Sequence, residues 1–188
     1  MKYCHLIPIK YFEKYYFLFI EMQIFIYRVC VVRQQDGESL SGLGSTTAAT
    51  VSMKHILGHV IDHVKAELGQ DTVTLLDSSC GDMNWMPGFL RARPGDVLYT
   101  GLDIVAANIE AHRKRFRNES WVFWQHDLVT DAVTSHDLVL CRHTLFHLKL
   151  SDIRRVLANF VASGSRYLLM TQQEQTCKPC WTMLKVPL

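Results

Sequence analysis

The chain has 188 residues, which suits one domain large enough to bury a hydrophobic core. Apolar residues make up 48% and charged residues 20%, a balance typical of a folded globular protein and not of a disordered one. The net charge of +2 gives no indication of a nucleic-acid partner, because such binders usually carry a clear basic stripe. The six cysteines lack the dense, regular pattern of a disulfide scaffold, so a reducing compartment, the cytoplasm, is the simpler interpretation.

Residues 1–33 form an apolar N-terminal extension. Within residues 3–32, Glu21, Gln23 and Arg28 interrupt the apolar run, so no uncharged stretch reaches the length of about 18 residues that a spanning helix needs. Each central charge costs about 2.5–3.5 kcal/mol on insertion, against about 0.3–0.6 kcal/mol gained per large apolar residue, so insertion is close to balanced. Two interpretations stay open: a weak anchor that makes the protein membrane-associated, or an extension that packs loosely on the domain.

A polar linker rich in Gly and Ser is predicted over residues 34–45, and a folded unit over 46–172. Ser45 is a candidate cap for a helix that runs to about Leu68, with Gly69 as its stop. The apolar residues of this segment lie on one face at helical spacing: Met53, Leu57, Val60, Ile61, Val64 and Leu68.

No metal site is predicted. Histidines recur every fourth residue from His55 to His63, but without an evident carboxylate or cysteine partner they indicate a solvated polar stripe. Cys177 and Cys180 form a C-x-x-C pair in a divergent C-terminal tail, residues 173–188. A lone pair is weak support for zinc, which usually takes four ligands, and weak support for a redox motif, because no strand precedes it.

Short apolar runs alternate with helical segments through the folded unit. Five strands are predicted, at 73–77, 97–103, 121–125, 137–141 and 167–170. Helices are predicted near 84–91, over 105–116, and from a cap at Ser151 to a stop at Gly164. Strands that alternate with helices imply right-handed crossovers, so the predicted fold class is α/β, a Rossmann-like parallel sheet flanked by helices.

Three of these strands end in, or run directly into, an acid: Asp77, Asp103 and Asp127. Each acid alone is equally well explained as a cap of the helix that follows its strand. In an open α/β sheet, however, ligands bind at the carboxyl ends of the strands. The three acids together therefore predict a binding site at this edge.

The first strand-to-helix turn contains Gly81, and a residue without a Cβ lets the backbone approach a ligand closely or take a positive φ. The dinucleotide fingerprint G-x-G-x-x-G is absent, because the turn has only one glycine. This absence argues against a nucleotide-dependent oxidoreductase.

The segment Leu76 to Asn84 resembles the first motif of class I S-adenosylmethionine (SAM)-dependent methyltransferases, roughly Leu-Asp-x-Gly-x-Gly-x-Gly. The acid and the middle glycine are kept, whereas Ser79 and Met83 stand where the family usually has glycine. A group of methyltransferase-like proteins has the variant Cys-Gly-Asp-x-Asn-Trp-Met, which Cys80 to Met86 resembles closely. Further shared blocks lie at 99–104, 137–142, 145–148 and 164–169. The match covers about residues 42–172 and is specific for fold and cofactor, not for substrate.

The resemblance implies SAM as the cofactor and assigns roles to the first two strand ends. Asp77 and Gly81 would line the methionine end of SAM, together with Ser79 and Cys80 of the same turn. Asp103 would accept hydrogen bonds from both ribose hydroxyls.

The resemblance also assigns the adenine and acceptor sides. Ile104 would lie against the adenine, and Asp127 would accept from its exocyclic amino group, with Leu128 beside it. Cys141 and Arg142, at the end of the fourth strand, would face the sulfonium and the substrate.

Candidate catalytic residues follow the fourth strand. Besides Arg142, His143 and His147 are the nearest candidates for a general base, should the acceptor need one. For both histidines a structural role is the simpler alternative, since His147 lies in a Phe-His-Leu context. The predicted function is methyl transfer from SAM to an unidentified small-molecule or protein acceptor.

The C-terminal part departs from the family. A full class I sheet has two more strands after the fifth, and the residues after 172 are too few for two strands and a crossover helix. The predicted fold therefore lacks the usual C-terminal strand pair and leaves an exposed edge on the fifth strand. A truncated, inactive methyltransferase-like binding or regulatory protein is the alternative function.

Overall fold

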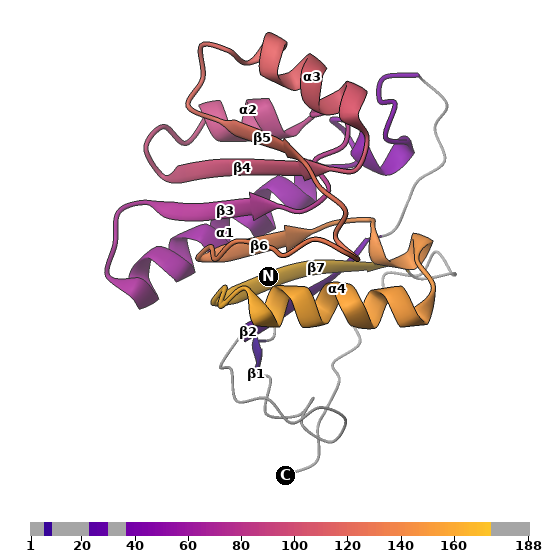
Figure 1. Ribbon diagram of the computed structural model, residues 1–188. Helices are drawn as coiled ribbons and strands as arrows, with labels where there is room; N and C mark the ends of the chain where they lie inside the picture. Colours follow the sequence, from indigo (N-terminus) through magenta and orange to yellow (C-terminus); the bar gives the residue numbers. More distant parts are fainter. Residues whose placement is uncertain (1–5, 9–22, 30–36, 174–188) are drawn as a thin grey trace.

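Figure 1 shows the computed structural model of the chain, in which residues 6–8, 23–29 and 37–173 are described. From residue 37 onward helices and strands alternate in the predicted order. The elements are a 3-10 turn η2 (Leu43–Ser45), α1 (Val51–Leu68), β3 (Val73–Asp77), α2 (Met86–Arg91), β4 (Val97–Asp103), α3 (Ala106–Arg115), β5 (Val122–Gln125), β6 (Leu138–Cys141), a 3-10 turn η3 (Leu145–His147), α4 (Leu150–Ala162) and β7 (Tyr167–Gln173). Cys177 and Cys180 lie outside the described residues.

The five predicted strands form a parallel sheet in the order β5-β4-β3-β6-β7. From β3, in the middle of these five strands, the chain runs outward through β4 and β5 and returns to the other side of β3 through β6 and β7. This reversal next to the first strand is the doubly wound arrangement of Rossmann-like folds. The predicted α/β class is confirmed.

The edge of β7 is covered by a strand from the N-terminal extension. β2 (Gln23–Val29) lies parallel to β7 along its whole length, and β1 (Leu6–Pro8) pairs antiparallel with the outer side of β2 (Figure 1). The prediction of an exposed edge on the fifth strand is therefore wrong. An unpaired strand edge presents free N–H and C=O groups, and here an extended segment far away in the sequence satisfies them.

The N-terminal extension was also predicted as a possible anchor. Of its residues, 6–8 and 23–29 are described, and both segments are strands of the sheet. No helix in the described part of the chain is long and apolar enough to cross a membrane.

Two hydrophobic clusters cover the two faces of the sheet. Because successive side chains of a strand point to opposite faces, Leu75 joins the cluster under α1, α2 and α3, while Leu76 joins the cluster under α4. Both leucines are fully buried. In α4, Val156 and Phe160 are buried in the second cluster. Packing on both faces fixes the strand ends that carry the three acids.

Helix α1 starts later than predicted. Ser45 closes a 3-10 turn through its N–H to the carbonyl of Gly42 (2.9 Å), and the Thr46 hydroxyl then bonds to the Leu43 carbonyl (3.1 Å). These local hydrogen bonds compete with helix formation, so the helix begins only at Val51. Gly69 ends it in the left-handed conformation at φ 62°, as predicted.

Helix α4 also begins differently. The residue before its first turn is Lys149, without a side-chain cap, and the hydroxyl of Ser151 bonds to Asp152 instead of a backbone N–H (3.5 Å). The prediction of Ser151 as the cap is therefore wrong. Gly164, at φ 74°, ends the segment as predicted.

Candidate functional site

The turn after β3 is bonded to the strands on both sides of it. The N–H of Ser78 donates to the carbonyl of Leu140 in β6 (2.9 Å), and its hydroxyl donates to the same oxygen (3.0 Å). On the other side, the N–H of Cys80 donates to the carbonyl of Leu102 in β4 (2.8 Å). This double attachment holds the turn in the middle of the sheet edge, where the resemblance places the cofactor.

Gly81 and Asp103 meet directly. The N–H of Gly81 donates to one carboxylate oxygen of Asp103 (3.0 Å), and the N–H of Val105 donates to the other (2.8 Å). A carboxylate has about four lone-pair sites, so both oxygens can still accept from a ligand. The structure therefore brings two predicted site residues, from different strand ends, into one hydrogen-bonded unit.

Glycine is needed at position 81 for two reasons. Its φ is 58°, in the left-handed region, and the side chain of Ser41 occupies the space that a Cβ would take. Any larger residue would displace either the turn or the segment that carries Ser41.

Asp77 lies beneath the turn. Its side chain is 4% exposed and accepts a hydrogen bond from the Tyr99 hydroxyl (2.9 Å). Burial raises the pKa of Asp77 to about 6, even though the Tyr99 hydroxyl, the Ser79 N–H and the charge of Arg142 favour the ionised form. A carboxylate held so far above its usual range is typical of a functional site.

Met83 replaces a family glycine but keeps a glycine-like backbone. Its φ is 54°, and its side chain is 1% exposed, with the sulfur 3.1 Å from the Tyr99 hydroxyl. The turn thus has a residue in the left-handed region here, as a glycine would allow, together with a buried side chain.

On the predicted adenine side, Ile104 follows directly after Asp103 and is 61% exposed. Its carbonyl accepts a hydrogen bond from the side chain of Gln125 at the end of β5 (3.3 Å). An exposed apolar side chain beside the acid offers a flat ring a surface to lie on.

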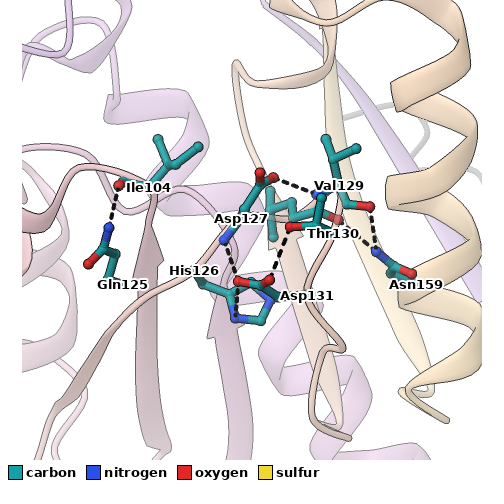
Figure 2. Close-up of polar contacts among 9 residues, drawn as sticks. Ile104, Gln125, His126, Asp127, Val129, Thr130, Asp131 and Asn159 are labelled. Carbon is teal, nitrogen blue, oxygen red and sulfur yellow. Dashed lines mark hydrogen bonds and ion pairs between the residues drawn. The ribbon is translucent and has the colours of Figure 1, made fainter.

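Asp127 lies in the loop between β5 and β6, which Figure 2 shows in close-up. One carboxylate oxygen accepts from the N–H of Val129 (2.9 Å), and the N–H of Asp127 donates to Asp131 (2.9 Å). Leu128 is buried, and Asn159 of α4 donates to its carbonyl (2.8 Å). These contacts tie the loop to α4 and fix the direction of the acid.

Arg142 follows β6 and is buried. Its guanidinium donates to the carbonyl of Gly44 and to the hydroxyl of Ser45 (3.2 Å), and it lies 5.5 Å from the centre of the Trp85 ring. The carbonyl of Arg142 accepts from the hydroxyl of Ser79 (3.3 Å). Arg142 thus links the first turn to the segment that precedes α1.

His143 and His147 occupy different environments. His143 has a φ of 55°, and its ring packs against Gly44. Burial and the positive charge of Arg142 lower the pKa of His143 to about 4, so the ring is neutral at physiological pH. His147 is exposed, and its ring lies 4.3 Å from that of Phe146.

The two cysteines of the site are buried and protonated. Burial raises the pKa of Cys141 to about 11 and that of Cys80 higher still. A thiol is a good nucleophile only as a thiolate, so neither cysteine is suited to covalent catalysis. Among the described residues, no cluster of three or more His, Cys, Asp or Glu side chains could hold a metal ion.

A segment that precedes α1, residues 38–47, is bound to the first turn. One carboxylate oxygen of Asp82 accepts from the Ser39 hydroxyl (2.7 Å), the Leu40 N–H (2.6 Å) and the Ser41 N–H (3.2 Å). Burial alone would raise the pKa of Asp82, but these bonds, with one from the N–H of Asn84, hold it below its usual value. We call residues 38–47 the strap.

The strap is fixed at a second point by Glu38. Its carboxylate accepts from the N–H and hydroxyl of Thr47 (2.8 and 2.5 Å) and from the side chain of Asn84 (2.9 Å). The sequence indicates only a polar linker here, because Gly and Ser residues are equally typical of linkers and of tight turns. No local pattern marks Asp82 as the residue that the strap binds.

Sequence reasoning also missed Tyr99 and His112. Tyr99 bonds to Asp77, and His112 of α3 bonds to the carbonyl of Gly81 (2.7 Å). One signal for His112 was present: with Ile109 and Phe116 it lies at helical spacing on the buried face of α3.

No family model matches the sequence, and the search of curated proteins gives no match. Solved structures that resemble the chain include magnesium protoporphyrin IX methyltransferase (ChlM) from Synechocystis PCC 6803 with bound SAM, at 17% identity and a TM-score of 0.47, over 63% of this chain and 58% of that chain. The N-methyltransferase NodS from Bradyrhizobium japonicum WM9 is 14% identical, with a TM-score of 0.43, over 61% and 64%. Coclaurine N-methyltransferase bound to N-methylheliamine and SAH is 14% identical, with a TM-score of 0.49, over 76% and 39%.

The chain spans less than two thirds of the length of each of these three proteins. Its own strand order, with the reversal beside β3 and the acids at the carboxyl ends, is that of a doubly wound sheet. The chain therefore has a Rossmann-like α/β fold, in which helices flank a doubly wound parallel sheet.

Proposed function

We propose that the chain binds SAM at the carboxyl edge of β3, β4 and β6 and transfers its methyl group to a small-molecule or protein acceptor. The observation that carries this proposal is the pairing of Gly81 with Asp103, which presents a carboxylate beside a close backbone turn. Ligands of doubly wound sheets bind at this kind of edge.

The groups along this edge fit the parts of SAM. Asp103 offers acceptor sites for two neighbouring hydroxyls, and Ile104, 61% exposed, offers an apolar surface for a purine. Asp127 is a further acceptor in the loop after the next strand, in position for an exocyclic amino group. Two acceptors separated by an apolar side chain match a nucleoside better than they match an extended anion, which would need donors.

SAM would supply an electrophilic methyl group on a sulfonium. The residues of the chain then need to hold the acceptor in line with that methyl group, and positioning of this kind accounts for much of the rate enhancement of such reactions. We assign Arg142 and His143 to positioning of the strap beside the acceptor site, because the buried Arg142 guanidinium bonds to Gly44 and the His143 ring packs against the same residue.

The proposal assigns no strong general base to His143. A base works best when its pKa is near the working pH, and a pKa of about 4 makes His143 a weak proton acceptor at neutral pH. For an acceptor that must lose a proton, the exposed His147 is the better candidate.

Calorimetry with SAM and with S-adenosylhomocysteine tests the binding step. We expect the parent chain to bind both, and Asp103→Ala to bind them at least tenfold more weakly, since hydrogen bonds to a charged group contribute about 1.5–3 kcal/mol each. Asp71→Ala is the matched control, because Asp71 is an exposed acid that precedes β3, at the other end of the sheet. Equal affinities of the parent and Asp103→Ala would contradict the proposed site.

Turnover needs a separate experiment. The parent and Asp103→Ala are incubated with cell extract and with SAM that carries a tritiated methyl group, and label is followed in the small-molecule and protein fractions. Label transfer that depends on Asp103 would support the methyltransferase. Binding of SAM without transfer to any fraction would favour the regulatory alternative.

A further inference from the structure

His112 is buried in the helix that follows Asp103. It lies in α3, its side chain is 4% exposed, and its ring packs 5.2 Å from the ring of Phe123 and 6.0 Å from that of Phe116. These aromatic neighbours hold the imidazole in one orientation, and that orientation points at the first turn.

The hydrogen bond from His112 goes to the glycine turn and not to its own helix. Its Nε2 atom lies 2.7 Å from the carbonyl oxygen of Gly81. A carbonyl oxygen can only accept, so Nε2 carries the proton and donates. A histidine needed only for packing could satisfy its ring nitrogens anywhere in the core, whereas this one bonds to the residue that also holds Asp103.

Both peptide groups of Gly81 are thereby fixed. Its N–H donates to the Asp103 carboxylate (3.0 Å), and its carbonyl accepts from His112. Glycine has the widest conformational freedom of any residue, and Gly81 stands in the left-handed region at φ 58°. The two hydrogen bonds supply the restraint that a glycine backbone lacks.

We propose that His112 is a positioning residue for the cofactor site: by holding the Gly81 carbonyl, it sets the direction of the Gly81 N–H and so of the Asp103 carboxylate. The inference rests on the proposed function, because Asp103 is the group assigned there to the ribose hydroxyls. His112, Gly81 and Asp103 come from the helix after β4, the turn after β3 and the end of β4, so the two hydrogen bonds through Gly81 link three elements at the site.

Two substitutions separate the donor from the ring. His112→Phe keeps an aromatic ring against Phe116 and Phe123 but removes the donor. His112→Gln loses the ring but keeps an amide N–H that can reach the same carbonyl. We expect His112→Phe to weaken SAM and S-adenosylhomocysteine binding about tenfold, because a turn that is no longer held at its carbonyl must be ordered when the cofactor binds, and ordering of this kind costs about 0.5–1.5 kcal/mol per immobilised group. We expect His112→Gln to recover most of the affinity.

Phe116→Leu is the control for a merely structural role. Phe116 is buried, directly follows the last residue of α3 and packs against the His112 ring, but it has no contact with Gly81 among the interactions that the structure describes. This variant should unfold at lower urea concentration than the parent and still bind SAM within about twofold of it. For His112→Phe, we further expect a raised KM for SAM with an unchanged kcat, because the ribose contact is the same in the ground state and the transition state.

The outcomes are distinguishable. His112→Phe with the affinity of the parent, or His112→Gln as weak as His112→Phe, overturns the positioning role and leaves the proposed function standing. A parent chain that binds no SAM overturns the proposed function and the positioning role together. Nitrogen-15 spectra of the imidazole test the contact without ligand, and a proton on Nδ1 alone would also overturn it.

Discussion

The buried carboxylate of Asp77 makes the stability of the protein depend on pH in an unusual direction. Burial raises its pKa from an ordinary value of 3.8 to about 6. The folded state therefore holds this proton more tightly than the unfolded state does. The stabilising contribution is present below about pH 4 and is lost as the pH rises through 6, the opposite of a salt-bridged aspartate.

The size of the effect on stability follows from the shift in the pKa of Asp77. A gap of about two pKa units corresponds to about 3 kcal/mol, at about 1.36 kcal/mol per unit. Asparagine has the same shape, keeps an oxygen that accepts from the Tyr99 hydroxyl, and does not ionise. Asp77→Asn should therefore raise the free energy of unfolding by about 1–3 kcal/mol at neutral pH, and the gain should vanish near pH 4.

Urea denaturation followed by tryptophan fluorescence, at neutral pH and near pH 4, measures this difference. Asp71→Asn removes one exposed carboxylate and controls for the change in net charge. A variant less stable than the parent at neutral pH, or a gain of the same size at both pH values, would refute the reasoning. A gain in stability together with weaker SAM binding would show that the buried charge is kept for function.

Two further predictions concern the same turn. Met83→Gly removes the strain of a left-handed backbone at a non-glycine residue, a gain of about 1 kcal/mol. It also empties a fully buried site, which costs about 2–5 kcal/mol. The free energy of unfolding should therefore fall by about 1–4 kcal/mol. Met83→Leu should cost less than about 1.5 kcal/mol in the same urea titration, and a glycine variant as stable as the parent would contradict this account. Asp82→Ala removes the acceptor of the strap, so the amides of Leu40 and Ser41 should exchange with deuterium several-fold faster while those of β3 do not change. Unchanged exchange at both amides would show that the remaining contacts of the strap, those of Glu38 and Arg142, hold it without the Asp82 carboxylate.

The sheet from β3 to β7 is largely predictable from the sequence. Runs such as 73–77 and 138–141 are short, apolar and bounded by polar residues, and a strand buried on both faces produces this pattern. The prediction of a helix cap at Ser45 is wrong because local hydrogen bonds of Ser45 and Thr46 form a 3-10 turn. The sequence alone does not show which of these local hydrogen bonds is favoured.

The place of β2 was not predictable. Its residues belong to an apolar run that Gln23 and Arg28 interrupt, and such a run fits an anchor, a buried helix or a sheet strand equally well. Only the partner decides among these, and the partner, β7, lies at the other end of the described chain. Pairing over so long a sequence separation leaves no local trace.

The contacts of the candidate site are also predictable only in part. That Asp103 and Gly81 lie together follows from two strand ends that share one edge of the sheet, so their contact could be expected. The burial of Asp77 could not, because its carboxylate bonds to Tyr99 of β4, whose hydroxyl in turn lies against the Met83 sulfur from the first turn. The strap contacts likewise depend on side chains that meet only in the folded chain.

The pairing of β2 with β7 also sets an order of events during synthesis. β2 leaves the ribosome early, and β7 follows only after almost all of the described chain has been made. Until then the Ile-Phe-Ile run of β2 has no sheet to join, and unpaired apolar strands are prone to association with other surfaces. β2 can therefore pair only after β7 has been made, and in a nascent chain of this protein the β2 segment has a long interval in which chaperones or lipids compete for it.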